Sequence, residues 1–348
     1  MRQMWPLSGQ GCDFLACTCL LVAYNAPCMP GSDSLPMVFA AALSDPGRKR
    51  ALNEDAVAQL ITPYGGIFVV ADGMGGHRTG EVASQMAVGQ IVEILKQREP
   101  SPQALLEAYE AANEAIYLAG QKPESRGMGT TCTALWLDLP YALIAHVGDS
   151  RAYLLRDGGL IQLTQDHSWV ADRVRQGLLS EDEARNHRWR NVITNALGSF
   201  PSARVDLVGL KVRPGDVFLL CSDGLSGVLE DRVLAEMVLT NPPEPAVAKL
   251  VKLANEWGGP DNISAVVVTI GSQVAEHPKP YALPLEASNG QPVRLFSGND
   301  PEVLTTQIVE PERKPTFWQR WGSLILLLLW LGLLGFVLFN QLGHGFAP

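Results

Sequence analysis

Four aspartates lie at the ends of apolar runs, where their side chains could act together on a metal ion. Asp72, Asp149 and Asp223 each follow a short apolar run, and Asp261 precedes one. Short β-branched runs beside Gly-rich turns are typical of buried strands, so we expect these acids at one rim of a sheet. Carboxylates about 4 Å apart repel each other by roughly 4 kcal/mol at an effective dielectric constant of about 20. Such a cluster needs a cation, and oxygen ligands without His or Cys favour Mg²⁺ or Mn²⁺ over Zn²⁺. A single Asp-Gly pair is more simply explained as a turn, but the set of four is not.

The elements that must position these acids are strands and helices spread over residues 37–271. Alternating or short apolar runs predict strands, apolar residues at helical spacing predict helices, and residues 165–195 resemble a helical flap. Antiparallel strands in runs, together with paired helices, indicate an α+β layered fold. The predicted strands are 37–42, 56–61, 66–71, 131–137, 141–147, 152–156, 160–163, 204–212 and 262–270, and the predicted helices are 80–96, 101–120, 230–240 and 245–257.

The size and charge of the chain exclude some classes of protein. Its 348 residues are ample for one large domain or two smaller ones. The formal net charge is −9 and the sequence has no basic stripe, so we expect no nucleic-acid partner. Cys132 and Cys221 lie in apolar, strand-like runs, which indicates buried free thiols in a reduced, cytosolic domain.

The C-terminal part of the chain has the pattern of a linker followed by a membrane anchor. Residues 272–316 are rich in proline and lack hydrophobic periodicity, which predicts a linker. The uncharged run Trp321–Phe339 would span about 28 Å as a helix, so we predict a transmembrane helix over residues 317–340. Cationic residues precede the run and none follows it. The positive-inside rule therefore predicts a single-pass protein of the cell membrane, with its domain in the cytoplasm and a short tail, 341–348, outside. A buried core helix is the alternative.

Residues 1–36 form a leader that need not belong to the working protein. Phe14–Tyr24 is apolar but only as long as the core of a signal peptide, and Asp13 interrupts its flank. An export signal would also invert the orientation that the C-terminal run predicts. We therefore favour Met37 as the true start.

Six short motifs follow one another along residues 37–271. The chain contains RALNED at Arg50–Asp55, DGMGGH at Asp72–His77, GTT at Gly129–Thr131, VGDSR at Val147–Arg151, CSDG at Cys221–Gly224 and GPDN at Gly259–Asn262. In this order they resemble those of the metal-dependent (PPM, type 2C) Ser/Thr protein phosphatases in their bacterial form. The resemblance implies a central β-sandwich of two antiparallel sheets flanked by helices, with a dinuclear metal site at one end of the sandwich.

The resemblance also implies a role for each acid around two, or three, Mn²⁺ or Mg²⁺ ions. Asp72 would bridge both ions, and the backbone carbonyl of Gly73 would hold one of them. Asp223 and Asp261 would hold the other. The remaining members of the set are Asp55 or Glu54, serving directly or through water, Asn262 behind the ligands, and Asp149, which resembles the acid that holds a third ion together with Asp223.

The implied chemistry is the hydrolysis of a phosphate ester. Two ions about 3.5–4 Å apart lower the pKa of a shared water, so that hydroxide forms near neutral pH and attacks phosphorus. Arg50 resembles the arginine that receives the substrate phosphate. Met74 stands where some eukaryotic members carry a general-acid histidine, and His77 is either a substitute for it or a residue that packs at the turn. The other polar residues of interest, His146, Arg151, His167 and Ser168, are expected to pack, to anchor the structure or to begin the flap.

Three functions remain to be separated. The leading hypothesis is an active phosphatase that acts on phosphorylated proteins and opposes a membrane Ser/Thr kinase. The second is a non-catalytic module that binds phosphorylated partners, and the presence of all the metal-ligand acids argues against it. The third is a metal-dependent hydrolase that acts on a small phosphate or on one dedicated partner.

Overall fold

The structure is a computed structural model that describes residues 38–75, 79–272, 292–297 and 304–308. The chain divides into two compact units, Met1–Val309 and Glu310–Pro348, and every described residue belongs to the first. The predicted leader, His77, the predicted transmembrane helix over 317–340 and the tail over 341–348 lie outside the described residues. Within the described ranges, no helix has the length and apolar character needed to cross a membrane.

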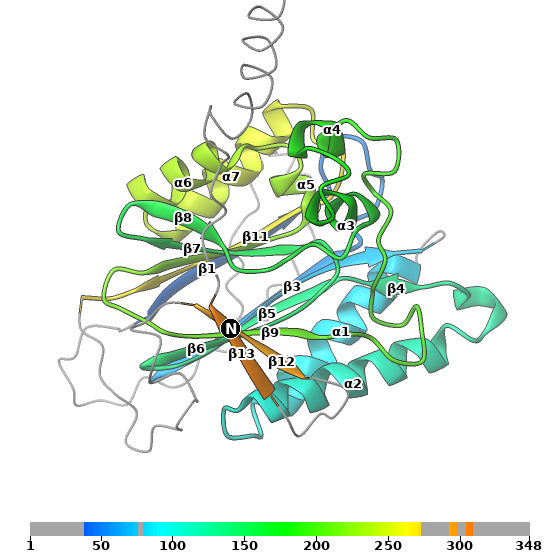
Figure 1. Ribbon diagram of the computed structural model, residues 1–348, viewed down its shortest axis with the longest axis horizontal. Coiled ribbons are helices and arrows are strands. Elements are labelled where there is room, and N and C mark those ends of the chain that lie inside the picture. Colours follow the sequence, from blue (N-terminus) through cyan, green and yellow to red (C-terminus); the bar gives the residue numbers. More distant parts are fainter. Residues whose placement is uncertain (1–37, 76–78, 273–291, 298–303, 309–348) are drawn as a thin grey trace, which may run out of the picture. The chain divides into compact units, whose positions relative to one another are not determined.

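Two antiparallel sheets form the centre of the first unit (Figure 1). The five-stranded sheet has the order β1 (Val38–Asp45), β11 (Ile263–Ile270), β10 (Val217–Cys221), β7 (Arg151–Arg156) and β8 (Gly159–Gln162). The eight-stranded sheet has the order β13 (Leu304–Ile308), β12 (Val293–Ser297), β9 (Asp206–Lys211), β6 (Tyr141–Val147), β5 (Cys132–Asp138), β3 (Gly65–Met74) and β2 (Asp55–Thr62), with β4 (Gly129–Thr130) paired to β3.

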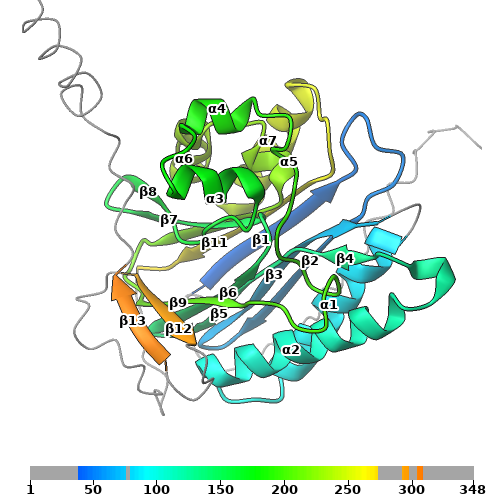
Figure 2. The same cartoon turned by 45° about the vertical axis from the view of Figure 1, so that its right-hand side comes forward.

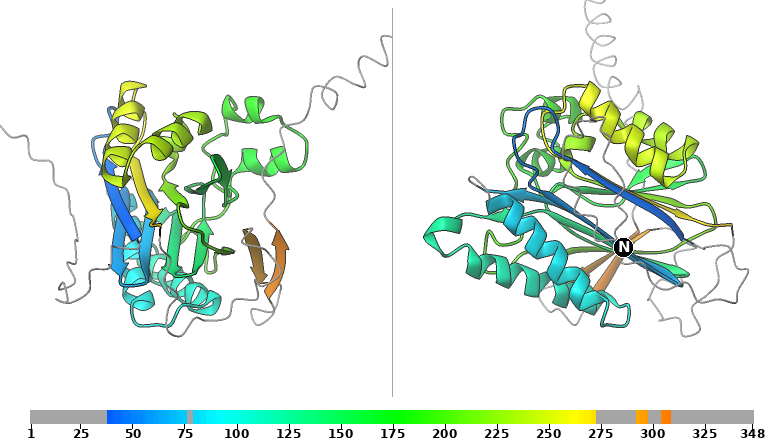
Figure 3. Two further views of the ribbon diagram at one scale, coloured as in Figure 1. Left: turned by 90° about the vertical axis from the view of Figure 1, so that its left-hand side faces the viewer. Right: turned by 180° about the vertical axis from the view of Figure 1, so that it is seen from behind.

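Helices cover the outer face of each sheet, as the views in Figure 3 show. The eight-stranded sheet packs against α1 (Thr79–Leu95) and α2 (Pro102–Ala119). The five-stranded sheet packs against α5 (Asp223–Ser226), α6 (Asp231–Thr240) and α7 (Pro243–Glu256). A flap containing α3 (Trp169–Arg175) and α4 (Glu181–Arg185) lies between β8 and β9 in the chain (Figure 2). The predicted sandwich of two antiparallel sheets flanked by helices is confirmed.

The layers explain why the strands that lead to the acids are apolar throughout. In β3, Phe68 and Val70 face the core between the two sheets, whereas Ile67 and Val69 face α1 and α2. The residues of β10 divide in the same way between the intersheet core and the layer of α5, α6 and α7. A strand covered on both faces has no solvent side and therefore no polar alternation.

The structure differs from the sequence prediction in the Pro-rich segment after β11. That segment, 272–316, is predicted to be a linker, yet it contains β12 and β13. β12 pairs with β9, which supplies hydrogen-bond partners to a strand that would otherwise have an open edge. Val293 and Leu295 are buried in the core under the helices, two residues apart, and this short alternation is hidden among the prolines.

Candidate metal and phosphate site

The β2–β3 hairpin brings together the acids of the eight-stranded sheet. Asp55, the first residue of β2, is the cross-strand partner of Asp72 near the end of β3. The N–H of Gly73 donates to the carbonyl of Glu54 over 3.1 Å and holds this end of the hairpin closed. A Cβ at Gly73 would lie 2.1 Å from the carbonyl oxygen of Gly80, so only glycine allows α1 to begin so close to the strand.

Neighbouring strands of the other sheet supply two more acids. Asp223 is the first residue of α5, directly after β10, and Asp261 lies just before β11, the antiparallel partner of β10. A Cβ at Gly224 would lie 1.9 Å from the carbonyl oxygen of Asn262, so the two loops touch only because this residue is glycine. Asp149, which is 8% exposed, follows β6 of the eight-stranded sheet. The cluster therefore draws on both sheets.

The acids raise one another's pKa. Burial, and then the charges of Asp55, Asp223 and Asp149, raise the pKa of Asp72 well above its usual value. Burial, and then the charges of Asp223 and Asp166, do the same to the pKa of Asp149. Burial is also the main cause that raises the pKa of Asp55 to about 7, although hydrogen bonds from two serines favour its ionised form. The structure thus gathers separate carboxylates into one electrostatic cluster.

The cluster has the chemistry that a hard divalent cation requires. Three buried carboxylate oxygens have no hydrogen-bond partner, namely Oε1 of Glu54, Oδ1 of Asp55 and Oδ1 of Asp223. The carboxyl groups of Asp72 and Asp223 are neighbours, and the charge of Asp223 helps to raise the pKa of Asp72, so this pair favours a shared proton. A cation would replace that proton and take the unpartnered oxygens as ligands, so the residues fit Mn²⁺ or Mg²⁺. Among the described residues, no three His, Cys, Asp or Glu side chains already form a metal-binding group.

A sequence profile described as "Protein phosphatase 2C" matches residues 47–262. The match spans every motif from Arg50 to Asn262 and most of the two-sheet unit. The chain belongs to the protein phosphatase 2C family. The described unit is a serine/threonine protein phosphatase domain of this family.

Two relatives show how far the likeness extends. The serine/threonine protein phosphatase PstP of Mycobacterium tuberculosis is 39% identical over 236 residues, which cover 66% of this chain and 44% of PstP. The chain thus matches less than half of the length of that relative. The protein phosphatase PhpP of Streptococcus pneumoniae is 36% identical over 245 residues, which cover 67% of this chain and 98% of PhpP.

Solved structures of the family share the fold. The crystal structure of M. tuberculosis PstP has a TM-score of 0.62 and 38% identity, and the match covers 67% of this chain and 99% of that one. A PstP catalytic domain solved in complex with two manganese ions has a TM-score of 0.61 and 36% identity, with 67% and 98% of the two chains covered.

Arg50 is the cationic side chain that reaches this cluster from the loop between β1 and β2. Its Nη2 donates to Oδ2 of Asp261 over 2.8 Å, and its side chain is 49% exposed. The hydrogen bond with Asp261 is the main cause that raises the pKa of Arg50. An exposed guanidinium beside the acids can receive an anion from solvent.

Two hydroxyl residues that the sequence reasoning treated only as motif letters support the acids. The hydroxyl of Ser222 donates to Oδ2 of Asp55 over 2.7 Å and accepts the N–H of Ser264 over 3.0 Å. The hydroxyl of Thr131 accepts the N–H of Asp72 over 3.0 Å. In the sequence, Ser222 stands directly before Asp223, and Thr131 stands directly before the strand that pairs with β3. These positions were the only sign in the sequence that the two hydroxyls could support the acids.

The polar residues beside the motifs are structural. His146 is buried, its Nε2–H donates to the carbonyl of Gln165, and burial lowers its pKa to about 3. His167 is buried and contacts Asp206 through Nε2 over 3.1 Å, so it is not open to a substrate. The other two have structural contacts as well: Arg151 forms a fork with Asp166, and Ser168 caps α3.

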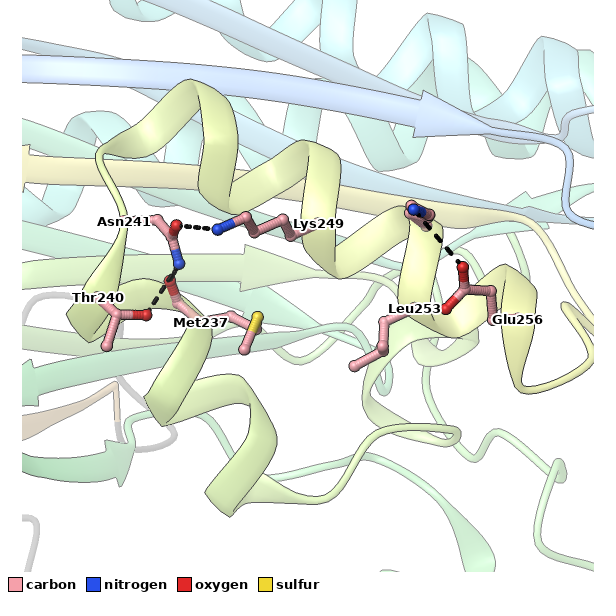
Figure 4. Close-up of a pocket in the computed structure, with 7 residues that line it drawn as sticks. Met237, Thr240, Asn241, Lys249, Leu253 and Glu256 are labelled. Atoms are coloured by element: carbon pink, nitrogen blue, oxygen red, sulfur yellow. Dashed lines mark hydrogen bonds and ion pairs between the residues drawn. The ribbon is translucent and has the colours of Figure 1, made fainter.

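A shallow pocket of about 330 Å³ lies between α6 and α7, on the helical layer over the five-stranded sheet (Figure 4). It shares no residue with the acidic cluster, and an ion pair between Lys252 and Glu256 lies at one end. Its lining residues are Met237, Thr240, Asn241, Lys249, Lys252, Leu253 and Glu256.

Proposed function

We propose that this chain hydrolyses phosphoserine and phosphothreonine in proteins, with two or three Mn²⁺ or Mg²⁺ ions as cofactors. The observation that carries the proposal is the convergence of Asp55, Asp72, Asp149 and Asp223, all with raised pKa values, in a domain of this family. Asp55 and Asp223 also have one buried oxygen each without a hydrogen-bond partner. The relatives named as protein phosphatases support the substrate class.

The residues that would hold the ions come from both sheets. Asp72 and Asp223 would both ligate the ions. The other candidates are Asp55, Asp261, the carbonyl of Gly73, and Asp149 for a third ion, with Glu54 behind them. When bound, such ions supply a nucleophile from water near neutral pH and offset charge on the phosphate.

The chain itself would bind and orient the substrate and supply a proton. Arg50 would grip the phosphate by a fork of N–H groups, and its hydrogen bond with Asp261 keeps the guanidinium beside the acids. The leaving serine or threonine oxygen needs a proton, and His77 is the candidate donor. His77→Ala should slow the hydrolysis of poor leaving groups more than that of good ones, and equal losses would refute this role.

We also propose that the domain is tethered to the cytoplasmic face of the cell membrane by a helix over residues 317–340. The support is the uncharged Trp321–Phe339 run with cationic residues only on its N-terminal side. A membrane Ser/Thr kinase would then be a natural antagonist, because both enzymes would work in the same thin layer. Alkaline carbonate washing of a membrane fraction tests the tether, and release of the protein would refute it.

The activity is tested with the full chain, a phosphothreonine peptide and Mn²⁺. We expect phosphate release that EDTA abolishes and Mn²⁺ restores, and activity that survives chelation would refute the mechanism. Asp223→Asn should lower activity by at least about 100-fold, since losing a metal ligand or its support commonly costs metal affinity on this scale. Asp157→Asn is the matched control: Asp157 also precedes a glycine, but it sits in the β7–β8 turn with a φ of 53° and an exposed side chain. Asparagine tolerates that conformation, so the control should stay active.

The same assay separates the competing functions. A phosphatase of proteins should have a higher kcat/KM for the phosphopeptide than for p-nitrophenyl phosphate. A hydrolase of small phosphates should reverse this order. A binding module should bind the phosphopeptide without turning it over.

A further inference from the structure

Asn262 uses its whole side chain to hold the loop that carries Arg50. Its Oδ1 accepts the N–H of Glu54 over 2.8 Å. Its Nδ2 donates to the carbonyl of Pro46 over 3.0 Å and to the carbonyl of Leu52 over 2.8 Å. The three partners lie near both ends of the 46–54 loop, and all are backbone groups. One buried amide, 4% exposed, therefore closes this loop onto the start of β11.

The fit between this loop and the Asp261 loop is tight along its length. The N–H of Arg48 donates to the carbonyl of Gly259 over 2.8 Å. Gly47 has a φ of +77°, and a Cβ there would lie 2.1 Å from the carbonyl oxygen of Asp261. The guanidinium of Arg50 reaches Asp261 from within this segment. The position of Arg50 relative to the acids therefore depends on where the loop is fixed.

We propose that Asn262 is the positioning residue for the phosphate-binding Arg50, an inference that rests on the proposed function. Its amide bonds saturate both of its donors and use its oxygen, so its role is to fix the loop rather than to ligate an ion. Removal of the amide leaves one N–H and two carbonyls of the loop without their partner, and such groups then turn towards water. The loop would loosen, and Arg50 would lose its fixed direction.

The chain contains a matched control for this arrangement. Asn113 of α2 is 3% exposed, and its Nδ2 donates to the carbonyls of Phe200 and Pro201 over 3.2 and 3.1 Å. Its Oδ1 accepts the N–H of Gly198 over 2.9 Å. Asn113 thus makes the same three bonds to a different loop. Asn113→Ala removes the same number and kind of bonds as Asn262→Ala, without releasing Arg50.

The test uses the full chain with Mn²⁺, inorganic phosphate as inhibitor and a phosphothreonine peptide as substrate. For Asn262→Ala we expect KM for the peptide and Ki for phosphate to rise together by about tenfold, because small displacements of a binding group commonly cost factors of this size or more. Its kcat should change by less than about threefold, since Asn262 touches neither substrate nor ions in this assignment. Asn113→Ala should leave KM and Ki unchanged. Asn262→Ser is the milder variant and should shift both constants in the same direction by a smaller factor.

Two further measurements separate positioning from general loss of structure. Amide hydrogen exchange should speed up over 47–54 in Asn262→Ala and near Gly198 in Asn113→Ala. Once Arg50→Ala has weakened phosphate inhibition, adding Asn262→Ala should weaken it little further, because both changes remove the same interaction.

The inference is overturned if Asn262→Ala leaves Ki for phosphate unchanged, if exchange over 47–54 does not change, or if Asn113→Ala shifts KM and Ki equally. If Arg50→Ala weakens phosphate inhibition and Asn262→Ala does not, this inference alone fails. If Arg50→Ala has no effect on phosphate, the proposed role of Arg50 fails and the inference fails with it.

Discussion

The metal-free protein should lose stability as the pH rises, and Asp55→Asn should remove part of that loss. The pKa of Asp55 is raised from 3.8 to about 7, so its carboxyl keeps its proton in the folded state at pH values where the unfolded chain has released it. A group with a raised folded pKa stabilises the fold at low pH, and this contribution disappears as the pH rises through the folded pKa. The window for Asp55 therefore runs from about pH 4 to about pH 7.

The size of the effect follows from the shift. The rise of about three units in the pKa of Asp55 corresponds to about 4 kcal/mol, at about 1.36 kcal/mol for each unit. Asparagine cannot ionise, and its amide oxygen can still accept the Ser222 hydroxyl that now donates to Asp55. We expect Asp55→Asn and the parent chain to have equal stability near pH 4, with the variant more stable by at most about 4 kcal/mol at pH 8.

Urea unfolding in EDTA, followed by tryptophan fluorescence from pH 4 to pH 8, measures this difference, since Trp136 is buried in β5. Saturating Mn²⁺ should narrow the gap at pH 8, because binding at 100 times Kd adds about 2.7 kcal/mol to the stability of the parent, whereas the variant lacks one of the proposed ligands. Asp216→Asn is the contrasting variant: it removes the negative charge that pairs with the buried Arg156 and should cost about 3–5 kcal/mol. A gap between parent and Asp55→Asn that stays constant over the pH range would refute the reasoning.

Three further outcomes are expected. Gly224→Ala should weaken Mn²⁺ binding by at least about tenfold, because its Cβ would lie 1.9 Å from the carbonyl oxygen of Asn262. The dependence of activity on Mn²⁺ concentration measures this, and an unchanged dependence would contradict the prediction. Gly89→Ala is the paired control in the exposed middle of α1, where a Cβ meets nothing within 4 Å, and it should raise the free energy of unfolding by about 0.5–1 kcal/mol. Ser222→Ala removes the hydroxyl that orients Asp55 and should raise the Mn²⁺ concentration for half-maximal activity about 10-fold or more; a change in kcat alone would argue against an orienting role.

The strands and the acids at their ends could be predicted from the sequence for a physical reason. β3 and β10 are buried on both faces, so each is a continuous apolar run that stops where the chain leaves the core at an acid. The cap at the start of α2 was equally visible, because Ser101 accepts the N–H of Ala104 and Pro102 follows it. The position of β12 could not be predicted, because the core-facing side of this strand shows only two buried apolar residues, Val293 and Leu295, and its partner β9 lies far away in the sequence.

The supporting contacts of the site were beyond the reach of sequence reasoning. Asn262 bonds to backbone groups 208 to 216 positions away. Nearly every residue type has the same backbone groups, so these contacts cannot be predicted from the sequence. The hydroxyl of Ser222 reaches Asp55 across 167 positions. The motifs therefore indicated which side chains could do the chemistry. Only the folded structure shows which neighbouring residues hold those side chains in place.

The origin of the acids in two separate sheets has a mechanical consequence. Asp72 belongs to one layer of the sandwich and Asp223 follows a strand of the other, with an apolar core between the layers. An ion held by both would act as a removable cross-link at that end, so the layers could not part there until it dissociated. Starvation for divalent ions should then expose the interior to proteases, beginning at the rim where the ions sit, and cellular ion supply would set the lifetime of the protein as well as its turnover.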